Sequence, residues 1–331
     1  MNEQLPTTAA VQKELDPREE KLRLAAPALG VAFVFLFSAL LQTVIHALVS
    51  LIDPALTYAD WYLWVVSSVP MYFVAMPLSL WIFRLSPAHP PKRRSLSPLT
   101  LLSLCALCFG LTYAGNLLGT LVNLLLGTVT GGEVVNELAQ TTVNSPFWTN
   151  LLFAGILAPI MEEIFFRKLI IDRISPWGEL PAILISGVAF GLIHGNFSQF
   201  FYAAALGMLF GAIYLKTGKL RYTVALHMAI NLVGGVFATE VVKLINAEAF
   251  LQDPMLALSQ NPFGAVMLLI YLGFMALILP ASIGAGIYLC LRKREPLQKG
   301  AISLTAAQWR QVILCNPGVW LFLAVAILLF L

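Results

Sequence analysis

The sequence predicts an all-α fold: a polytopic membrane helix bundle of about eight or nine transmembrane helices, with its N-terminus in the cytoplasm. Of its 331 residues, 59% are hydrophobic and only 11% are charged. A soluble globular domain carries about 25% charged residues, so the composition excludes that class. Long apolar runs and the placement of the basic residues between them are the other two observations. The protein is expected to be an integral, multi-pass membrane protein.

Nine apolar runs are candidate membrane spans, since a span needs about 20 predominantly apolar residues. The fifth and sixth runs are short and are joined by only a few residues, whereas the third and eighth are long enough to tilt in the bilayer. The predicted spans are residues 27–50, 61–83, 99–127, 148–171, 180–195, 199–215, 222–242, 262–291 and 312–331.

These runs form one expected domain, a single polytopic membrane domain at 27–331. A cytoplasmic N-terminal segment at 1–26 precedes it. Residues 1–25 mix acidic and basic groups, and no small-residue cleavage site is evident, so they do not resemble a signal peptide.

The basic residues support this order of spans. With the N-terminus inside, every lysine and arginine except Lys243 falls at the cytoplasmic ends of the spans or in cytoplasmic segments. The outer connections carry acidic residues instead, including Asp53, Asp60 and Glu133. This asymmetry follows the positive-inside rule, and an error of one span in the middle of the chain would destroy it.

The fourth run contains two adjacent glutamates, in the stretch APIMEEIFFRKL at 158–169. Adjacent residues of a helix point about 100° apart, so Glu162 and Glu163 cannot have the same role. Glu163 and Arg167 are four residues apart with the acid first, which favours an ion pair. Glu162 has no such partner and is expected to face a cavity. Pro159 removes a helix hydrogen bond and is expected to open the backbone near Gly155.

Polar groups recur on two later runs. His194 lies four residues after Phe190, on the same helix face, and Gly195 could end that helix. His227 and Asn231 have the same spacing and form one polar ridge. His46 has only Gln42 as a polar neighbour on its face, so it is interpreted as structural.

Two carboxylates, two histidines and an asparagine suit two kinds of hydrolysis. Two histidines and a glutamate are a zinc ligand set with room for a water, here Glu162, His194 and His227. In the metal-free alternative, a Glu/His pair activates water and His227 with Asn231 donates to the oxyanion. The HExxH pattern of soluble zinc proteases is absent.

Together these residues resemble a known family. EEIFFR at 162–167, FGLIH at 190–194 and HMAIN at 227–231 match, in order, the EExxxR, FxxxH and HxxxN motifs of the CPBP family of CAAX proteases and bacteriocin-processing enzymes, also called Abi. The resemblance covers a protease-like core at about 145–245 and extends to the type II CAAX prenyl endopeptidase. The stretch around these motifs is especially similar to bacterial members, which implies a multi-pass protein of a bacterial cytoplasmic membrane.

The resemblance implies an intramembrane endopeptidase that hydrolyses a bond in a peptide or a membrane-associated protein. Glu162, assisted by His194, would activate water. His227 and Asn231 would polarise the scissile carbonyl, and Glu163 with Arg167 would support the site. The family is named for metalloprotease activity, and the motifs leave open whether Zn²⁺ takes part.

Two other functions remain open at this point. The protein could be a non-proteolytic scaffold, or a peptide-binding or immunity protein of the same fold. It could also be a transporter that uses Glu162 and the histidines as a proton relay, although no inverted repeat is seen. The expected partners are a peptide or membrane-protein substrate and the lipid bilayer; no nucleic acid is expected.

Overall fold

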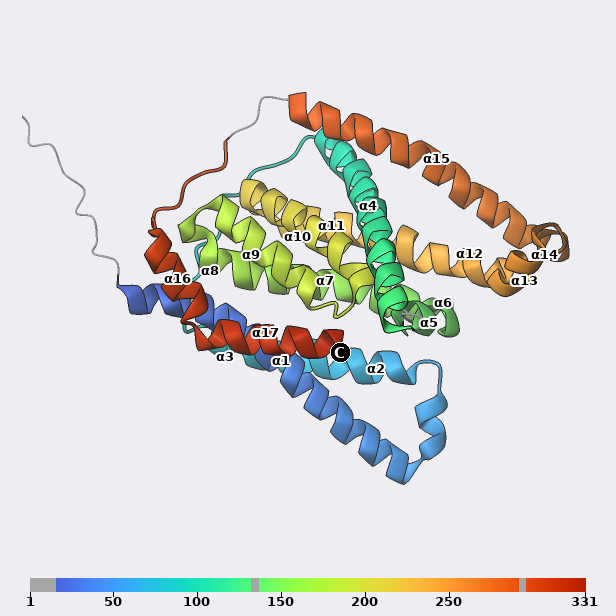
Figure 1. Cartoon of the computed structure of the whole chain (residues 1–331), viewed down its shortest axis with the longest axis horizontal. Coiled ribbons are helices and arrows are strands. Elements are labelled where there is room, and N and C mark those ends of the chain that lie inside the picture. Colours follow the sequence, from blue (N-terminus) through green and yellow to red (C-terminus); the bar gives the residue numbers. More distant parts are fainter. Residues whose placement is uncertain (1–15, 132–136, 292–295) are drawn as a thin grey trace, which may run out of the picture.

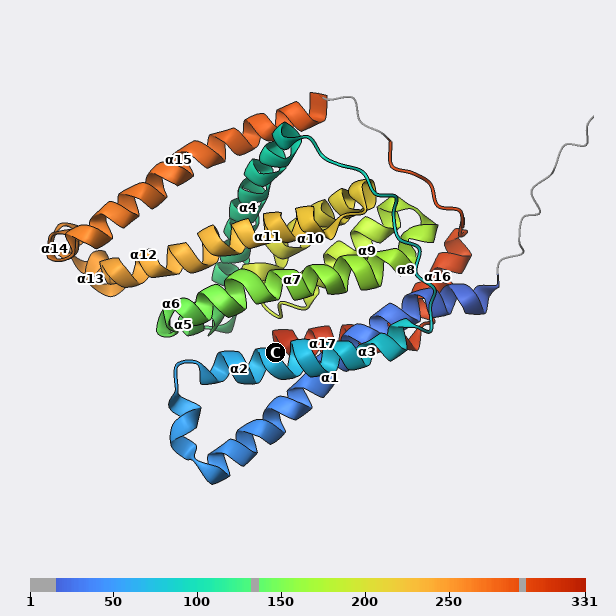
Figure 2. The ribbon, with the colours of Figure 1, turned by 180° about the vertical axis from the view of Figure 1, so that it is seen from behind.

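The structure, a computed structural model, describes residues 16–131, 137–291 and 296–331. Within these ranges every regular element is a helix, and the one β-bridge joins Gly178 to Lys299. The predicted all-α fold is therefore confirmed. Figures 1 and 2 show the helices as layers that lie roughly side by side, with α4 crossing them.

The first layer holds the N-terminal helices and the last helix. A long helix, α1 (Pro17–Ile52), returns through η1 (Pro54–Tyr58) into a second span. Pro70 interrupts that span, which consists of α2 (Tyr62–Val69), a π-helical turn η2 (Pro70–Ala75) and α3 (Met76–Phe83). The helix α17 (Pro317–Phe330) packs along α1 (Figure 1).

The central layer holds the three motifs. Its first span comprises α6 (Phe147–Thr149), η3 (Asn150–Leu157), α7 (Ala158–Glu163), η4 (Ile164–Ile171), α8 (Asp172–Ile174) and η5 (Ser175–Trp177). Next come α9 (Glu179–Leu192) and α10 (Phe197–Thr217), which pack against each other. The last span comprises α11 (Leu220–Ile230), η6 (Asn231–Phe237) and α12 (Ala238–Ile245).

The remaining helices border this layer. A long helix, α4 (Pro98–Thr130), packs on α10 and on α15 (Pro262–Leu291). Three short helices lie in the connections: α5 (Glu137–Asn144) precedes α6, while α13 (Ala247–Gln252) and α14 (Pro254–Gln260) join α12 to α15. The last short helix, α16 (Ala306–Leu314), precedes α17.

The described helices include seven that are long and apolar enough to span a membrane, or eight if the bent pair α16–α17 is one span. The fifth predicted span, 180–195, is too short: α9 has 14 residues, or about 21 Å of helix, against a hydrocarbon core of about 30 Å. The last predicted span is broken by a bend of 57°, because the Asn316 side chain and Pro317 start a new helix. The chain is an integral, multi-pass membrane protein.

The first helix also begins before the predicted boundary at residue 27. Asp16 caps α1 by accepting from the backbone N–H of Arg18, and Glu20 and Arg23 are already buried. Part of the expected 1–26 segment is therefore helix packed on the bundle, while residues 1–15 lie outside the described residues.

A tight turn ends α9 inside the molecule. Gly195 has a φ of +66°, a conformation that favours glycine. The end of α17 covers this turn, since a Cβ at Gly195 would lie 2.5 Å from the carbonyl oxygen of Leu329 and Phe330 packs on Phe197. The short α9 thus places His194 at a turn that another helix closes.

Basic segments from distant parts of the chain meet at one end of the bundle. The backbone N–H of Arg94 donates to the carbonyl of Thr217, and the Arg23 guanidinium donates to the carbonyl of Arg173. Lys216 reaches both Glu179 and the carbonyl of Pro296. By the positive-inside rule this end faces the cytoplasm.

Candidate functional site

Glu163 forms the predicted ion pair with Arg167. The Arg167 guanidinium donates to both carboxylate oxygens, at 2.9 and 3.3 Å, and both side chains are fully buried. A third nitrogen donates to Ser186 on α9, which in turn donates to the carbonyl of Phe166. Because all these groups are paired, the ion pair and Ser186 hold α7 and η4 in a fixed position against α9.

The same glutamate also positions a histidine from another span. Oε1 of Glu163 lies 3.2 Å from Nδ1 of His227, on α11. The His227 ring is held between Phe190 and Phe210, at centroid distances of 5.7 and 5.5 Å. A carboxylate that accepts from Nδ1 leaves Nε2 free to face the cavity. Glu163 therefore orients His227 in addition to pairing with Arg167.

Glu162 points in a different direction, as helix geometry predicts. Its Oε1 accepts from the hydroxyl of Tyr72 at 3.4 Å, and its Oε2 lies 3.8 Å from Nε2 of His227. The Glu162 side chain is 17% exposed, whereas that of Glu163 is fully buried. Glu162 is therefore the carboxylate available to a bound molecule.

His194 lies at the turn between α9 and α10. Its Nδ1 is 2.7 Å from the carbonyl of Phe190, an acceptor that requires the hydrogen to be on Nδ1. Nε2 of the neutral ring is then an acceptor. The ring also packs edge-on against Phe190, at 4.9 Å. The FxxxH spacing thus fixes the tautomer and the orientation of His194.

Asn231 donates to the carbonyl of Ala154, which has no backbone donor because Pro159 lacks an N–H. In the π-helical η3, the N–H of Ala158 donates to Phe153, and Pro159, the next residue along the chain, has no N–H. The carbonyl of Ala154 instead accepts from Nδ2 of Asn231 at 2.9 Å. The predicted irregularity near Gly155 is present. It holds the Asn231 side chain through one Nδ2 hydrogen, and the second Nδ2 hydrogen remains available to donate to a bound group.

These side chains meet at one cavity of about 220 Å³, lined by Glu162, His194, His227 and Asn231 together with Trp64, Tyr72, Ala154, Ala158, Phe190, Gln199, Tyr202, Ala203 and Leu206. All four predicted residues with direct roles therefore lie together. Glu162 is ten residues before Asp172 at the basic end, or roughly two to three helical turns. The cavity thus lies inside its span and not at the basic end.

Sequence reasoning missed the polar residues that line the rest of the cavity. Asn196 donates to Gln199, whose amide then donates to the hydroxyl of Tyr202 at 3.0 Å. This order leaves the Tyr202 hydrogen free to donate to another group. Asn196, Gln199 and Tyr202 follow His194 closely in the sequence, and that spacing was an available signal. Tyr72 and Trp64 come from a distant helix, and nothing in the sequence connects them with the motifs.

His46 lies outside the cavity. Its Nδ1 is 3.1 Å from the hydroxyl of Tyr62, within the first layer of helices. The separate Gln42 side chain donates to the carbonyl of Ser67. A hydrogen-bonded histidine that links α1 to α2 agrees with the structural role expected for His46.

The donor types at the cavity suit zinc, which binds imidazole nitrogens and carboxylate oxygens. Both histidines also have Nδ1 held by an acceptor, as the ligands of zinc sites commonly do. In the described part of the chain, however, no three His, Cys, Asp or Glu side chains lie close enough together to hold a metal ion. The spacing of Glu162, His194 and His227 therefore does not complete a ligand set for zinc.

Comparison with known proteins identifies the segment that carries the site. Residues 144–233 match the family described as Type II CAAX prenyl endopeptidase Rce1-like. This range includes all three motifs and ends just after Asn231. The resemblance drawn from the motifs is therefore confirmed, and it supports a membrane protease at the level of the family.

The chain is also similar to proteins of two bacteria. It is 29% identical over 102 residues to the protein named "Putative membrane peptidase YdiL" from Bacillus subtilis. It is 29% identical over 127 residues to UPF0177 protein YxdF from Lactococcus lactis, and 26% over 98 residues to UPF0177 protein YbdJ from the same organism. These matches cover 30%, 38% and 29% of this chain.

The similarity extends over only part of most of these relatives. The chain spans 42% of the length of YdiL, 70% of YxdF and 42% of YbdJ. No solved structure matches the chain significantly.

Proposed function

We propose that this multi-pass membrane protein, with its Rce1-like segment at 144–233, is an intramembrane endopeptidase of the CAAX type. It would hydrolyse a peptide bond in a peptide or a membrane-associated protein. The supporting observation is that Glu162, His194, His227 and Asn231, from three separate segments of the chain, line one cavity inside the bundle.

In this proposal, a water molecule is held between Glu162 and Nε2 of His194. Both groups are acceptors that face the cavity, because Nδ1 of His194 is already engaged by Phe190. Glu162 takes a proton from the water as the oxygen attacks the scissile carbonyl carbon. Glu162 later returns the proton to the leaving amine, so the C–N bond breaks and the carboxyl product forms.

The oxyanion that forms would be stabilised by His227 and Asn231. The free hydrogen of Asn231 Nδ2 is one donor, since the other is used by Ala154. Nε2 of His227 would be the second donor when the ring carries both protons, since Glu163 already holds Nδ1. Donors fixed before the reaction act strongly in a site that excludes water.

The cavity also limits what part of a substrate can enter. About 220 Å³ is smaller than the roughly 300–1,000 Å³ of a site that buries a whole drug-sized ligand. The cavity therefore suits the peptide unit being cut, while the rest of the substrate lies outside it. The identity of that substrate, including whether it carries a prenyl group, is left to experiment.

The first test compares the membrane peptides of cells that produce either the wild-type protein or Glu162→Ala. Peptides that accumulate only with the wild type define cleavage sites, and synthetic peptides that span these sites are then incubated with purified protein. We expect Glu162→Ala, His194→Ala and His227→Ala each to lower the rate about 100-fold or more. His46→Ala, which removes a membrane histidine outside the cavity, should retain the rate. Wild-type rates in all three cavity variants would refute the proposal.

The zinc prediction needs a separate measurement. Elemental analysis of the purified wild type and of His227→Ala counts bound metal independently of activity. Zinc near one equivalent in the wild type, lost in the variant, would mean that the ligands move together when metal binds. A wild type that cleaves without zinc would support the metal-free route described above.

A further inference from the structure

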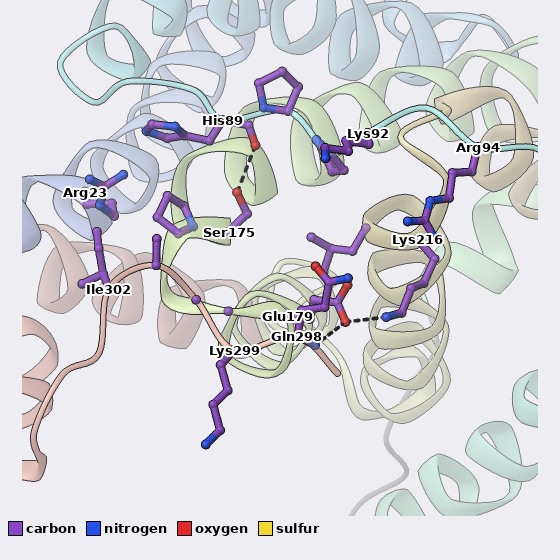
Figure 3. Close-up of a pocket in the computed structure, with 17 residues that line it drawn as sticks. Arg23, His89, Lys92, Arg94, Ser175, Glu179, Lys216, Gln298, Lys299 and Ile302 are labelled. Carbon is purple, nitrogen blue, oxygen red and sulfur yellow. Dashed lines mark hydrogen bonds and ion pairs between the residues drawn. The ribbon is translucent and has the colours of Figure 1, made fainter. Parts of the chain in front are cut away.

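A second cavity, of about 680 Å³, lies at the basic end of the bundle (Figure 3). It is separate from the site above and shares no lining residue with it. Five parts of the chain form its walls: α1, the segment after α3, the turn from α8 to α9, the end of α10, and the segment before α16. Its lining includes five cationic side chains, Arg23, Lys92, Arg94, Lys216 and Lys299, and one acidic side chain, Glu179.

The walls are fixed by bonds that do not use the cavity's lysines. Backbone N–H groups of Glu179 and Ile302 donate to the carbonyls of Gln298 and Pro176. Gly178, with a φ of +110°, allows this approach, because a Cβ there would lie 2.9 Å from the nitrogen of Gly300. The segment after α3 is held in the same way, by the bond between Ser175 and the carbonyl of His89 and by the bond from Arg94 to Thr217.

The cationic groups divide into paired and unpaired ones. Arg23 is paired with Glu20, and Lys216 with Glu179 at 2.8 Å. The side chains of Lys92 and Lys299, from different walls, have no hydrogen bond or ion pair within the described part of the chain. These two positive charges line one cavity and lack a negative partner. A bound anionic group would supply that partner.

An apolar groove lies next to this cavity. It has a volume of about 300 Å³, lies between α1, α9 and the α16–α17 pair, and every residue that lines it is apolar. The two features adjoin on α1, where Arg23 lines the cavity and Leu24 lines the groove. A positively charged cavity beside a wholly apolar groove, at the inner boundary of a membrane protein, matches the two ends of an anionic phospholipid.

We infer that the cavity and groove bind one anionic phospholipid of the inner leaflet. Its headgroup would lie in the cavity, which Lys92 and Lys299 line from different walls, and an acyl chain would follow the groove beside Leu24 and Phe322. Basic pockets between helices on the cytoplasmic side are suited to anionic headgroups. Lysine contributes here as a point charge, so the site selects for charge and not for headgroup shape.

The test counts lipids retained by the purified full-length protein in native mass spectrometry. The protein is offered dioleoyl phosphatidylglycerol and, in parallel, the same chains on phosphatidylcholine. We expect the double variant Lys92→Gln, Lys299→Gln to bind phosphatidylglycerol about 30-fold more weakly, which is ~1 kcal/mol for each lysine removed. Binding of phosphatidylcholine should not change.

A matched control separates this site from the general charge of the inner face. The double variant Arg93→Gln, Arg310→Gln removes the same charge from exposed side chains that do not line the cavity. It should bind phosphatidylglycerol as the wild type does. Equal losses in the two double variants would mean nonspecific attraction and would overturn the inference.

Two further arms test the occupant. Val188→Trp, at an exposed groove position, should weaken phosphatidylglycerol binding while leaving Lys92 and Lys299 in place. Inorganic phosphate should not displace the lipid, since it lacks the chain. Displacement by phosphate, or unchanged binding in Val188→Trp, would identify a soluble anion as the occupant and would overturn the lipid assignment.

Discussion

At the scale of single residues, Glu162 and Glu163 differ through their partners. Glu163 is fully buried and accepts from Arg167, with His227 beside it. Glu162 is partly exposed to the cavity, and Tyr72 donates to it. Removing the charge of Glu163 should therefore lower the stability of the fold. Removing the charge of Glu162 should instead lower the proposed peptide-cleaving activity.

Exchange of each glutamate for glutamine tests this division. Glu163→Gln leaves the Arg167 charge buried without its partner, which should lower the free energy of unfolding by about 3–5 kcal/mol. Glu162→Gln should change stability little, because Tyr72 can still donate to the amide oxygen. Per folded molecule, Glu162→Gln should lose more peptide-cleaving activity than Glu163→Gln. Thermal unfolding in detergent and peptide cleavage measure the two effects, and the reverse order of activities would refute the assignment.

At this scale the sequence predicts contacts within a helix but not contacts between helices. The four-residue spacing correctly gave the Glu163–Arg167 pair and the shared face of Phe190 and His194. The contact of Glu163 with His227 joins residues 64 apart, and that of Tyr72 with Glu162 joins residues 90 apart. Such contacts depend on how the spans pack, which the helical period does not specify.

At the scale of elements, the turn at Gly195 joins the site to the last helix. Both Gly195 and Gly131 have positive φ, of +66° and +72°. A Cβ at Gly195 would meet the backbone of Leu329 at 2.5 Å, whereas a Cβ at Gly131 would meet no atom within 4 Å among the described residues. The two glycines therefore share the same backbone requirement and differ in their packing.

Exchange of each glycine for alanine separates the cost of the left-handed backbone conformation from the cost of packing. Gly131→Ala should lower the free energy of unfolding by about 1–2 kcal/mol, the cost of the left-handed conformation. Gly195→Ala should lose about 1–3 kcal/mol more, because α17 must move away from the turn. It should also reduce peptide cleavage, since the turn carries His194. Equal destabilisation of the two variants would show that α17 does not constrain the turn.

The elements also show where apolar patterning is sufficient and where it is not. Long runs correctly gave the spans that contain α1, α4, α10 and α15, because length and composition alone define them. The pattern did not distinguish α9, which is short and whose final turn is covered by the end of α17, from a complete span. It also did not predict the bend between α16 and α17, where Asn316 caps the second helix. In both places a local turn determines where the helix ends. Hydropathy, which is averaged over many residues, does not detect such a turn.

At the scale of the whole molecule, the basic residues define one end of the bundle. Segments that are far apart in the chain bring Arg23, Arg94 and Lys216 to that end. Lys243 lies near the other end of the bundle, where it pairs with Glu240 and donates to the carbonyl of Ser145. The cavity beside Glu162 lies between the two ends, so the side from which a substrate would reach it depends on the orientation of the protein.

Labelling of single cysteines tests this orientation. The protein has four cysteines, which are first replaced by serine, and then one exposed serine at each end is exchanged for cysteine. Ser259→Cys lies on α14 in the outer connection, and Ser303→Cys lies in the basic segment before α16. A membrane-impermeant maleimide should label Ser259→Cys in intact cells and Ser303→Cys only after the membrane is opened. The opposite pattern would place Lys92 and Lys299 outside the cell, and would exclude both the predicted topology and a lipid of the inner leaflet.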